Sequence, residues 1–463
     1  MKRKLWTLLL ALGAALALCI GASAADFTGW DEVTNSTTTL ESGKQYYLNN
    51  DVTVSQTITV SGTVTLDLNG HVLKYVSANK GSVIKVENGG QLTIEDSNTS
   101  NLSHIFNPNG KLWVLDEASG TETVTGGVIT GGTGYPFPLT SGRVVYYGGG
   151  VYIAPGGQLT MTGGNIIGCS TEYGGGVCID SERNGEPGQF SMSGGSIAGC
   201  VASNSGGGVY ARAEGSVFNM SGTSAIHDCR CSDSGGGVRA CGTFQMSGHA
   251  VIRNCTAESE TEYIYGGGVY VNSSSFVMSG EAKIEGCRAI SNPSKSSNGG
   301  GVYLTNNTNF TLSGNAVIQN CTAANSVNSG EAYGGGVSAI CMRQITLADS
   351  ARIVGCTAAN GSGLYITGSL AYPNVYGKLY ANGGSVDGDV VLGDTTDGSC
   401  TITGSGRTVF KGKVTVTTGS TIESGTFNGE VINNGTITGG VFTGPVINNG
   451  TITLSLIHIS EPT

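Results

Sequence analysis

A sequence pattern that recurs seven times between Gly148 and Ile366 limits the possible folds more than any other feature. Each copy opens on Gly-Gly-Gly, continues with Phe-x-Met or a similar apolar pair, and closes on Ile-x-x-Cys. From Ile166 in the first copy to Ile353 in the seventh there are six intervals, so the mean period is about 31 residues. Self-similarity at this length is typical of solenoids, arrays and propellers. The triplets begin at Gly148, Gly174, Gly206, Gly235, Gly266, Gly299 and Gly334, and an incomplete eighth copy begins at Gly361.

The apolar residues inside each copy are spaced two apart, as in Val269-Tyr-Val271 and Phe276-Val-Met278. This is the period of a β-strand with one buried face, and no segment of the repeat has helical spacing. We therefore predict an all-β fold, a right-handed parallel β-helix (solenoid) with three short strands per rung of about 31 residues. A propeller blade needs about ten more residues and tight hairpin turns, which makes a propeller the less favoured alternative.

Stacking the copies in register aligns equivalent residues into ladders about 4.8 Å apart. We expect three buried ladders, and we interpret the methionines as gap-filling core residues and not as a soft-metal site. The triple glycines are expected at a corner where side chains would collide between rungs or where φ is positive. The first ladder comprises Leu159, Phe190, Phe218, Phe244, Phe276, Phe310 and Ile345; the second Met161, Met192, Met220, Met246, Met278, Leu312 and Leu347; the third Ile166, Ile197, Ile226, Ile252, Ile284, Ile318 and Ile353.

The first residues have the features of a secretory signal. Met1-Lys-Arg-Lys4 is basic, an apolar run follows, and Ala22-Ser-Ala24 is a small-x-small cleavage site. We predict cleavage after Ala24 and a secreted or cell-surface location. No second run of about 20 apolar residues follows, so we expect no membrane span in the mature chain.

The remaining chain divides by the regularity of its rungs. The last ten residues do not continue the pattern, and we expect them to be a non-native tail. The predicted segments are a signal peptide (1–24), an N-terminal cap (25–45), irregular first rungs (46–147) with a side insertion near 101–145, regular repeats (148–366), shorter-period rungs (367–453) and the tail (454–463).

Charge excludes one class of partner. The chain has 23 basic and 33 acidic residues, and only 12% of its residues are charged, without a basic patch. We therefore expect no nucleic-acid binding.

Three segments carry a family resemblance. Leu66-Asp-Leu-Asn-Gly-His71, Gly126-Gly-Val-Ile-Thr-Gly-Gly132 and the Gly-Gly-Gly-Val-Tyr copies resemble the exported β-helix repeat proteins of Gram-positive anaerobes. Those proteins have the pectin-lyase-like fold and often end in anchoring modules. The resemblance covers roughly residues 40–453 and implies a surface location. It implies no single activity, because the same fold carries lyases, hydrolases and inert stalks.

Catalytic candidates are few. The Asn-Thr-Asp, Asp-Asp, Gly-His-Gly and Arg-x-Lys motifs of the hydrolases with this fold are absent from the sequence. The residue after each ladder isoleucine is expected to point outward, which places His227, Arg253 and Glu285 in a line on three successive rungs. A base and a cation at such positions are what a polysaccharide lyase needs. A solvated face of mixed charge is the simpler interpretation.

Tyrosines form the second outward feature. Tyr152, Tyr210, Tyr270 and Tyr303 occupy the same position after their glycine triplets. An aromatic row of this kind can stack on sugar rings, and we take these four as candidate ligand-binding residues. Tyrosines on neighbouring strands also stabilise a sheet simply by packing on each other, which is the alternative.

These features favour an exported, non-catalytic adhesin, stalk or glycan-binding rod of a cell surface. Its expected partners are extracellular glycans or host or cell-wall surfaces, with no cofactor and no metal. The alternative is a polysaccharide lyase or glycoside hydrolase of the pectin-lyase-like fold, and a passive spacer is a third hypothesis.

Cysteines are unusually frequent. Twelve remain after Cys19 of the signal, and an exported chain with so many cysteines ordinarily has disulfides. Neighbours in a parallel stack have β-carbons about 4.8 Å apart, however, and a disulfide prefers 3.5 to 4.5 Å. We therefore predict free thiols that a bend at the strand end turns into the core, with some disulfides or a metal as alternatives. The seven repeat cysteines are Cys169, Cys200, Cys229, Cys255, Cys287, Cys321 and Cys356.

Overall fold

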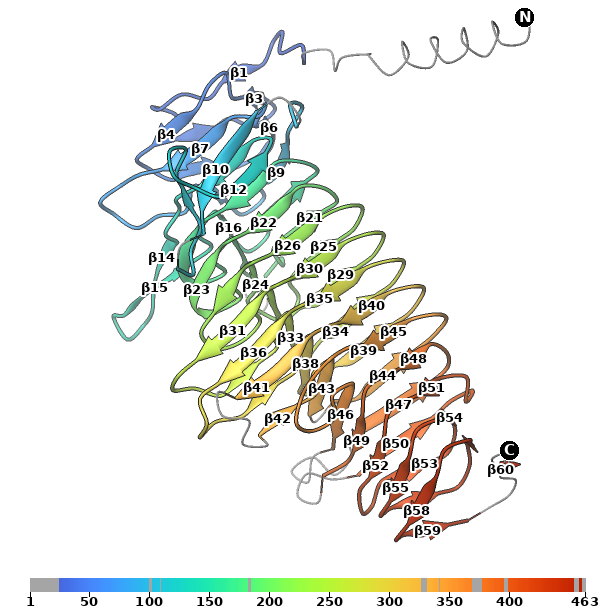
Figure 1. Ribbon diagram of the computed structural model, residues 1–463. Helices are drawn as coiled ribbons and strands as arrows, with labels where there is room; N and C mark the ends of the chain where they lie inside the picture. Colours follow the sequence, from blue (N-terminus) through green and yellow to red (C-terminus); the bar gives the residue numbers. More distant parts are fainter. Residues whose placement is uncertain are drawn as a thin grey trace, which may run out of the picture.

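The computed structural model is a long coil of short strands (Figure 1). It describes residues 25–99, 102–108, 110–181, 185–325, 331–340, 342–368, 377–394, 399–453 and 458–459. The predicted signal peptide and most of the predicted tail lie outside the described residues. No helix in the described part is long and apolar enough to span a membrane.

Each turn of the coil visits three long parallel sheets, as the rung that begins at Val209 illustrates. In this rung β24 (Val209–Ala211) is followed by β25 (Val217–Met220) and then β26 (Ala225–His227). Each strand pairs in parallel with the equivalent strands of the preceding and following rungs. We name the three sheets by their buried residues: the Val sheet (β24), the Phe sheet (β25) and the Ile sheet (β26).

The three sheets extend over almost the whole described chain. The Phe sheet has 16 strands, from β1 (Asp31–Glu32) to β59 (Thr451–Ile452). The Ile and Val sheets have 15 strands each; the first extends from β4 (Val52–Val54) to β60 (His458–Ile459), the second from β2 (Thr39–Leu40) to β58 (Val446–Asn448). The predicted all-β parallel coil is therefore confirmed.

The central rungs contain a fourth strand that the sequence pattern did not predict. After β26, the chain forms β27 (Arg230–Cys231) before it returns to the Val sheet at β28 (Val238–Ala240). Such strands build an outer sheet of eight strands, from β14 (Tyr135–Pro138) to β41 (Thr322–Asn325). The prediction of three strands per rung was therefore incomplete for these rungs.

The length of a rung depends on this fourth segment. Near the C-terminal end, β54 (Thr426–Phe427) leads almost directly to β55 (Val431–Asn433) without an outer strand. Val431 pairs with Val446 of the next rung, only 15 residues later. Three strands and three connecting turns thus complete one rung of the coil in about half of the 31-residue period.

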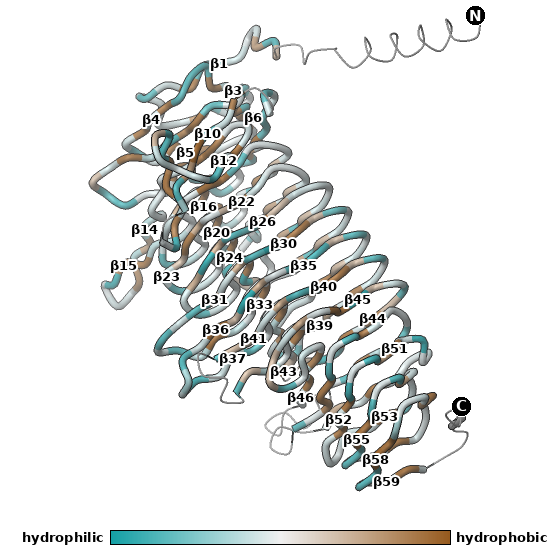
Figure 2. The backbone as a smooth tube through the Cα atoms, in the orientation of Figure 1, coloured by the Kyte–Doolittle hydropathy of each residue, from teal (hydrophilic) through white to brown (hydrophobic). Residues whose placement is uncertain are grey.

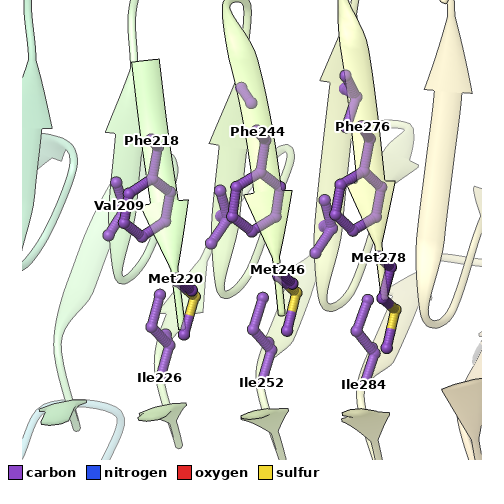
Figure 3. Packing of buried hydrophobic residues seen from close by; sticks show 14 of the residues in the cluster. Val209, Phe218, Met220, Ile226, Phe244, Met246, Ile252, Phe276, Met278 and Ile284 are labelled. Carbon is purple, nitrogen blue, oxygen red and sulfur yellow. The ribbon is translucent and has the colours of Figure 1, made fainter. Parts of the chain in front are cut away.

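The core consists of the predicted ladders in register. Phe218 pairs with Phe244, and Phe244 with Phe276, and their rings stack almost parallel with centroids 5.0 and 4.7 Å apart (Figure 3). The methionine and isoleucine ladders lie beside them, also buried. Along the backbone, hydrophobic stretches recur on the strands of successive rungs (Figure 2).

A backbone bend turns each repeat cysteine inward. The residue before each ladder cysteine has a positive φ, for example +54° at Asp228 and +53° at Asn254. Glycine, Asn and Asp are the residues that adopt this conformation most readily. Strict alternation after Ile226 would point Cys229 outward, but the bend at Asp228 returns it to the core, where it is fully buried. The predicted strand-end bend is therefore confirmed.

The glycine triplets allow close contact between rungs. A Cβ on Gly207 would collide with the backbone carbonyl of Gly236 in the next rung and with that of Arg230. Both obstacles are backbone atoms of neighbouring rungs, so neither can move independently of the stack. The absence of a side chain, and not only backbone freedom, is what this corner requires.

Replacement of Gly207 by Ala is expected to lower the free energy of unfolding by about 1–3 kcal/mol, as overpacking does. The matched control is Gly163→Ala, because a Cβ there would have only one atom as close as 3.0 Å, the backbone nitrogen of Asp96. Chemical denaturation of both variants checks this expectation. Equal stabilities of the two variants would contradict the role assigned to the corner.

The segment predicted as one side insertion near 101–145 forms two separate structures. β10 (Ser103–Asn107), β11 (Val114–Leu115) and β12 (Glu122–Thr125) make a small antiparallel sheet. The chain then returns to the Ile sheet at β13 (Val128–Thr130), before the hairpin of β14 and β15 (Val144–Tyr147) starts the outer sheet. The small sheet packs through Phe106 and Trp113 on the outward face of the Ile sheet.

Candidate functional site

The candidate tyrosines form a row on the outward face of the Val sheet. Tyr152 pairs with Cys178, which pairs with Tyr210, and Tyr270 pairs with Tyr303 farther along. The four side chains point away from the coil core, as predicted.

Most of this row is covered. Tyr152, Tyr210 and Tyr303 are only 3%, 8% and 6% exposed, and Tyr270 is half-buried. The ring of Tyr135, on the β14–β15 hairpin, stacks on Tyr152 at 4.8 Å. The open row of stacking platforms expected from the sequence is therefore not what the structure shows, because an added hairpin and neighbouring tyrosines cover it. Packing of tyrosines on each other, the alternative interpretation, describes these contacts better.

Arg239 occupies the rung between Tyr210 and Tyr270. Its guanidinium lies 5.5 Å from the centroid of the Tyr210 ring and 5.0 Å from that of Tyr270. It also donates a hydrogen bond to the Ser205 hydroxyl at 2.7 Å and lies 3.5 Å from the Asp233 carboxylate. This arginine replaces a ring in the stack by a cation–π contact on both sides.

Alkaline pH tests the burial of this row. Burial raises the pKa of Tyr270 to about 12, although Arg239 opposes the shift, whereas a tyrosine in an unfolded chain has a pKa of about 10. Between these values the unfolded chain loses a proton that the folded chain keeps, so stability is lost as pH rises from about 10 to about 12. In the variant Tyr270→Phe, this part of the stability loss is expected to vanish. Chemical denaturation of the parent chain and of the variant across this pH range checks it. If stability depends on pH equally in both proteins, the burial of Tyr270 is contradicted.

A hollow lined by residues of several rungs lies at the covered end of the row. Its volume is about 780 Å³, and we call it the aromatic hollow. Its lining comprises Phe137, Tyr152, Pro155, Asp180, Ser181, Gly185, Pro187, Arg212, Ala213, Glu214 and Gly215.

An ion pair between two successive rungs is the polar centre of the aromatic hollow. Asp180 follows β20 (Val177–Ile179), and Arg212 follows β24 at the equivalent position of the next rung. One Arg212 nitrogen donates to both oxygens of the Asp180 carboxylate, at 2.9 and 2.8 Å. The Tyr152 hydroxyl donates to the same carboxylate at 2.7 Å. Asp180 is almost completely buried, so these partners hold its charge in place.

Aromatic rings support the arginine from the hairpin side. The Arg212 guanidinium lies 4.9 Å from the ring centroids of both Phe137 and Tyr147. Burial, and the charge of Asp180, raise the pKa of the Tyr152 phenol, which therefore stays protonated as a donor. The hollow thus combines a partly exposed ring, two prolines and a fixed set of polar groups. This combination suits a ligand with apolar faces and hydroxyl groups.

The predicted row of His227, Arg253 and Glu285 is present. These residues pair in register on three successive strands of the Ile sheet. His227 Nδ1 lies 2.8 Å from the Asp228 carboxylate, and its ring contacts Trp113 edge-on at 5.9 Å. The small antiparallel sheet therefore covers the His227 end of this row.

A groove of about 520 Å³ lies beside this row, and we call it the charged groove. Lys111 of the insertion approaches Glu258 to 3.5 Å, so the insertion also contacts the groove. No group of three or more metal-ligating side chains occurs among the residues described. The groove is lined by Asp228, Arg230, Asn254, Thr256, Glu258, Gly286, Arg288 and Ile290.

Sequence reasoning did not find Asp180, Arg212 or Phe137. A signal for the first two existed, because opposite charges occupy the same position of adjacent copies, four residues after the last glycine of each triplet. Phe137 belongs to a hairpin outside the repeat, and its place beside Arg212 has no periodic signal.

Comparison with known proteins identifies the repeats. A family model described as a right-handed β-helix region matches residues 149–340. Searches of curated proteins and of solved structures gave no match. The matched family agrees with the predicted right-handedness. Together with the long parallel sheets, this match supports the interpretation of the chain as a β-helix repeat protein.

Proposed function

We propose that this chain is an exported, non-catalytic cell-surface rod that binds extracellular glycans in the aromatic hollow. The observation that carries the proposal is the Asp180–Arg212 pair at the centre of a hollow walled by Phe137, Tyr152 and Pro187. Sugar rings have apolar faces that pack on aromatic rings, and hydroxyl groups that exchange hydrogen bonds with charged side chains.

The Asp180 carboxylate at the polar centre of the hollow is suited to binding rather than to proton transfer. The Asp180 carboxylate accepts hydrogen bonds from both Arg212 and Tyr152. A general base needs an available carboxylate or imidazole within reach of the substrate. A carboxylate engaged on two sides instead presents a rigid surface, which lowers the entropic cost of binding.

Glycan arrays test this proposal. Phe137→Ala is expected to weaken binding by about fivefold, since stacking on a ring contributes on the order of 1 kcal/mol. The matched control is Tyr263→Ala, which removes a ring that is 45% exposed and lies outside the hollow lining. Equal binding by the two variants, or no binding by the parent chain, would contradict the site.

The proposed export rests on the basic and apolar segment before Ala24 and on the family resemblance. Expression in a Gram-positive host is expected to place the chain outside the membrane, with Ala25 as its first residue. N-terminal sequencing of the extracellular protein checks both points.

A lyase or hydrolase is the second candidate function, and the His227–Asp228 contact favours it. Asp228 lines the charged groove and holds the His227 ring, and a histidine held by a carboxylate is a typical general base. Incubation with uronate polysaccharides would then generate unsaturated ends by lyase chemistry or reducing ends by hydrolysis, and His227→Ala would abolish the product. Product formation that survives this substitution would exclude the groove as the active site.

A further inference from the structure

The charged residues that line the aromatic hollow do not balance one another. Arg212 is the one cation among the described residues of the lining, and both oxygens of the Asp180 carboxylate already accept hydrogen bonds from it. The remaining charged residue of the lining is Glu214, which is exposed. Its carboxylate has no hydrogen bond or ion pair within the part of the chain that the structure describes. The hollow therefore presents one carboxylate that no cation neutralises.

A tight turn between β24 and β25 fixes the position of Glu214. Ser216 closes this turn by donating from its backbone nitrogen and its hydroxyl to the Ala213 carbonyl, at 3.1 and 2.6 Å. The turn is also tied to the preceding rung, because the Ser181 hydroxyl donates to the Glu214 backbone carbonyl at 3.4 Å. The backbone of Glu214 is therefore held in the wall of the hollow, and its carboxylate stays available to a ligand.

A second carboxylate without a cation lies at the rim of the hollow. Glu186 directly precedes the lining residue Pro187 and is exposed. A Cβ added to Gly156, which follows the lining residue Pro155, would lie 3.4 Å from the Glu186 Cβ. No ion pair of Glu186 occurs among the described residues. The charges that remain available at the hollow are therefore both negative.

We propose that the aromatic hollow selects glycans that carry free amino groups, such as oligomers of glucosamine, over neutral and acidic glycans. This inference rests on the proposed glycan binding and adds a charge preference to it. An ammonium group of the sugar pairs with the Glu214 carboxylate while the ring of the sugar packs on Phe137. The aromatic wall favours the same ligand, because the face of an aromatic ring attracts cations. The Arg212 guanidinium, 4.9 Å from the Phe137 ring centroid, shows that this ring already has a cation beside it.

Acidic sugars are disfavoured by the same groups. A uronate needs a cation to pair with, but a single Arg212 nitrogen already donates to both oxygens of Asp180. A carboxylate on the ligand would also be repelled by Glu214, and like charges brought together in an interface suppress binding of the wrong partner. The formal net charge of the chain, −10, adds to this preference over a longer range.

A divalent metal ion fits these carboxylates less well than an ammonium group does. Calcium takes six to eight oxygen ligands, and magnesium requires a nearly octahedral set. No group of three or more side chains that could hold a metal ion occurs among the residues described. An ammonium group needs only one carboxylate and an apolar surface beside it, and the hollow offers both.

The test is the affinity of the whole chain for oligomers of glucosamine, N-acetylglucosamine and galacturonate of equal length, measured by calorimetry at low salt. We expect the glucosamine oligomer to bind about threefold more tightly than its acetylated counterpart, as a partly exposed ion pair does. The galacturonate oligomer is expected to bind most weakly. The preference should vanish in about 1 M salt, where the Debye length is about 3 Å.

The outcomes separate this inference from the proposed function. Equal or weaker binding of the glucosamine oligomer, with clear binding of its acetylated counterpart, would overturn the charge preference and leave the glycan site standing. Absence of binding by all three oligomers would overturn both. A preference for galacturonate would also overturn the inference.

Two variants assign the preference to one carboxylate. Glu214→Gln keeps the shape of the side chain and removes its charge, so it is expected to lower the affinity for the glucosamine oligomer to that for the acetylated one. The matched control is Glu262→Gln, which removes another exposed carboxylate outside the lining and is expected to keep the threefold preference. Both positions are exposed, so both variants are expected to fold, and their unfolding temperatures check this. A preference that survives in Glu214→Gln would overturn the proposal.

Discussion

Replacement of Phe244 by Asp is expected to lower the free energy of unfolding by more than about 4 kcal/mol, and to disrupt the coil locally. Loss of a buried phenylalanine alone costs about 3–5 kcal/mol, and an unpaired carboxylate in the core adds a desolvation cost. The ring of Phe244 is fully buried between those of Phe218 and Phe276. Because each rung contacts only its neighbours, the disturbance should be greatest in these three rungs.

Thermal and chemical unfolding measure this loss, and hydrogen exchange locates it. The matched control is Gln245→Asp, which adds the same charge at the next residue of the strand, where the side chain is exposed. This control is expected to change stability by less than about 0.5 kcal/mol. Unfolding of Phe244→Asp that matches the control would mean that the ladder is not the core.

Arg212→Ala is expected to cost about 3–5 kcal/mol, as the loss of one partner of a buried ion pair does. The substitution leaves the Asp180 carboxylate, whose side chain is 3% exposed, with Tyr152 as its remaining side-chain partner. The double variant Arg212→Met with Asp180→Leu is expected to recover most of the stability, because it removes both charges. Glycan binding is expected to be lost in both Arg212→Ala and the double variant, which separates the stability of the hollow from its function.

The control for this ion pair is Arg143→Ala. Arg143 pairs with Glu172 at 2.8 Å, but its side chain is 66% exposed. An exposed pair contributes about 0–1 kcal/mol. Equal losses in Arg212→Ala and Arg143→Ala would show that the burial of Asp180 has no energetic consequence.

The coil and its ladders were predictable from sequence because the same side chain recurs at the same offset. Phe244 and Ile252 have equivalents in neighbouring copies, and a one-residue slip would turn all of them outward. The inward turn of Cys229 was predictable for the same reason, since a small polar residue or glycine precedes every repeat cysteine.

The outer sheet and the cover over the tyrosines were not predictable in this way. The outer strand that starts at Arg230 differs from copy to copy in length and composition, because it is not confined by the main core. The burial of Tyr152 depends on Tyr135, which belongs to a hairpin that occurs once. The aromatic hollow depends on the same hairpin for its Phe137 wall, so the repeat contained a signal for Asp180 and Arg212 but none for the wall that faces them.

The stacking of rungs also determines how the chain responds to tension. The hydrogen bonds between rungs run along the coil axis, so a force on the two ends separates one rung from the next instead of shearing many bonds together. A central rung of about 31 residues releases roughly 100 Å of extended chain, and a C-terminal rung of 15 residues roughly 50 Å. The rod is therefore expected to lengthen in steps of two sizes, with the small steps marking the rungs that lack an outer strand.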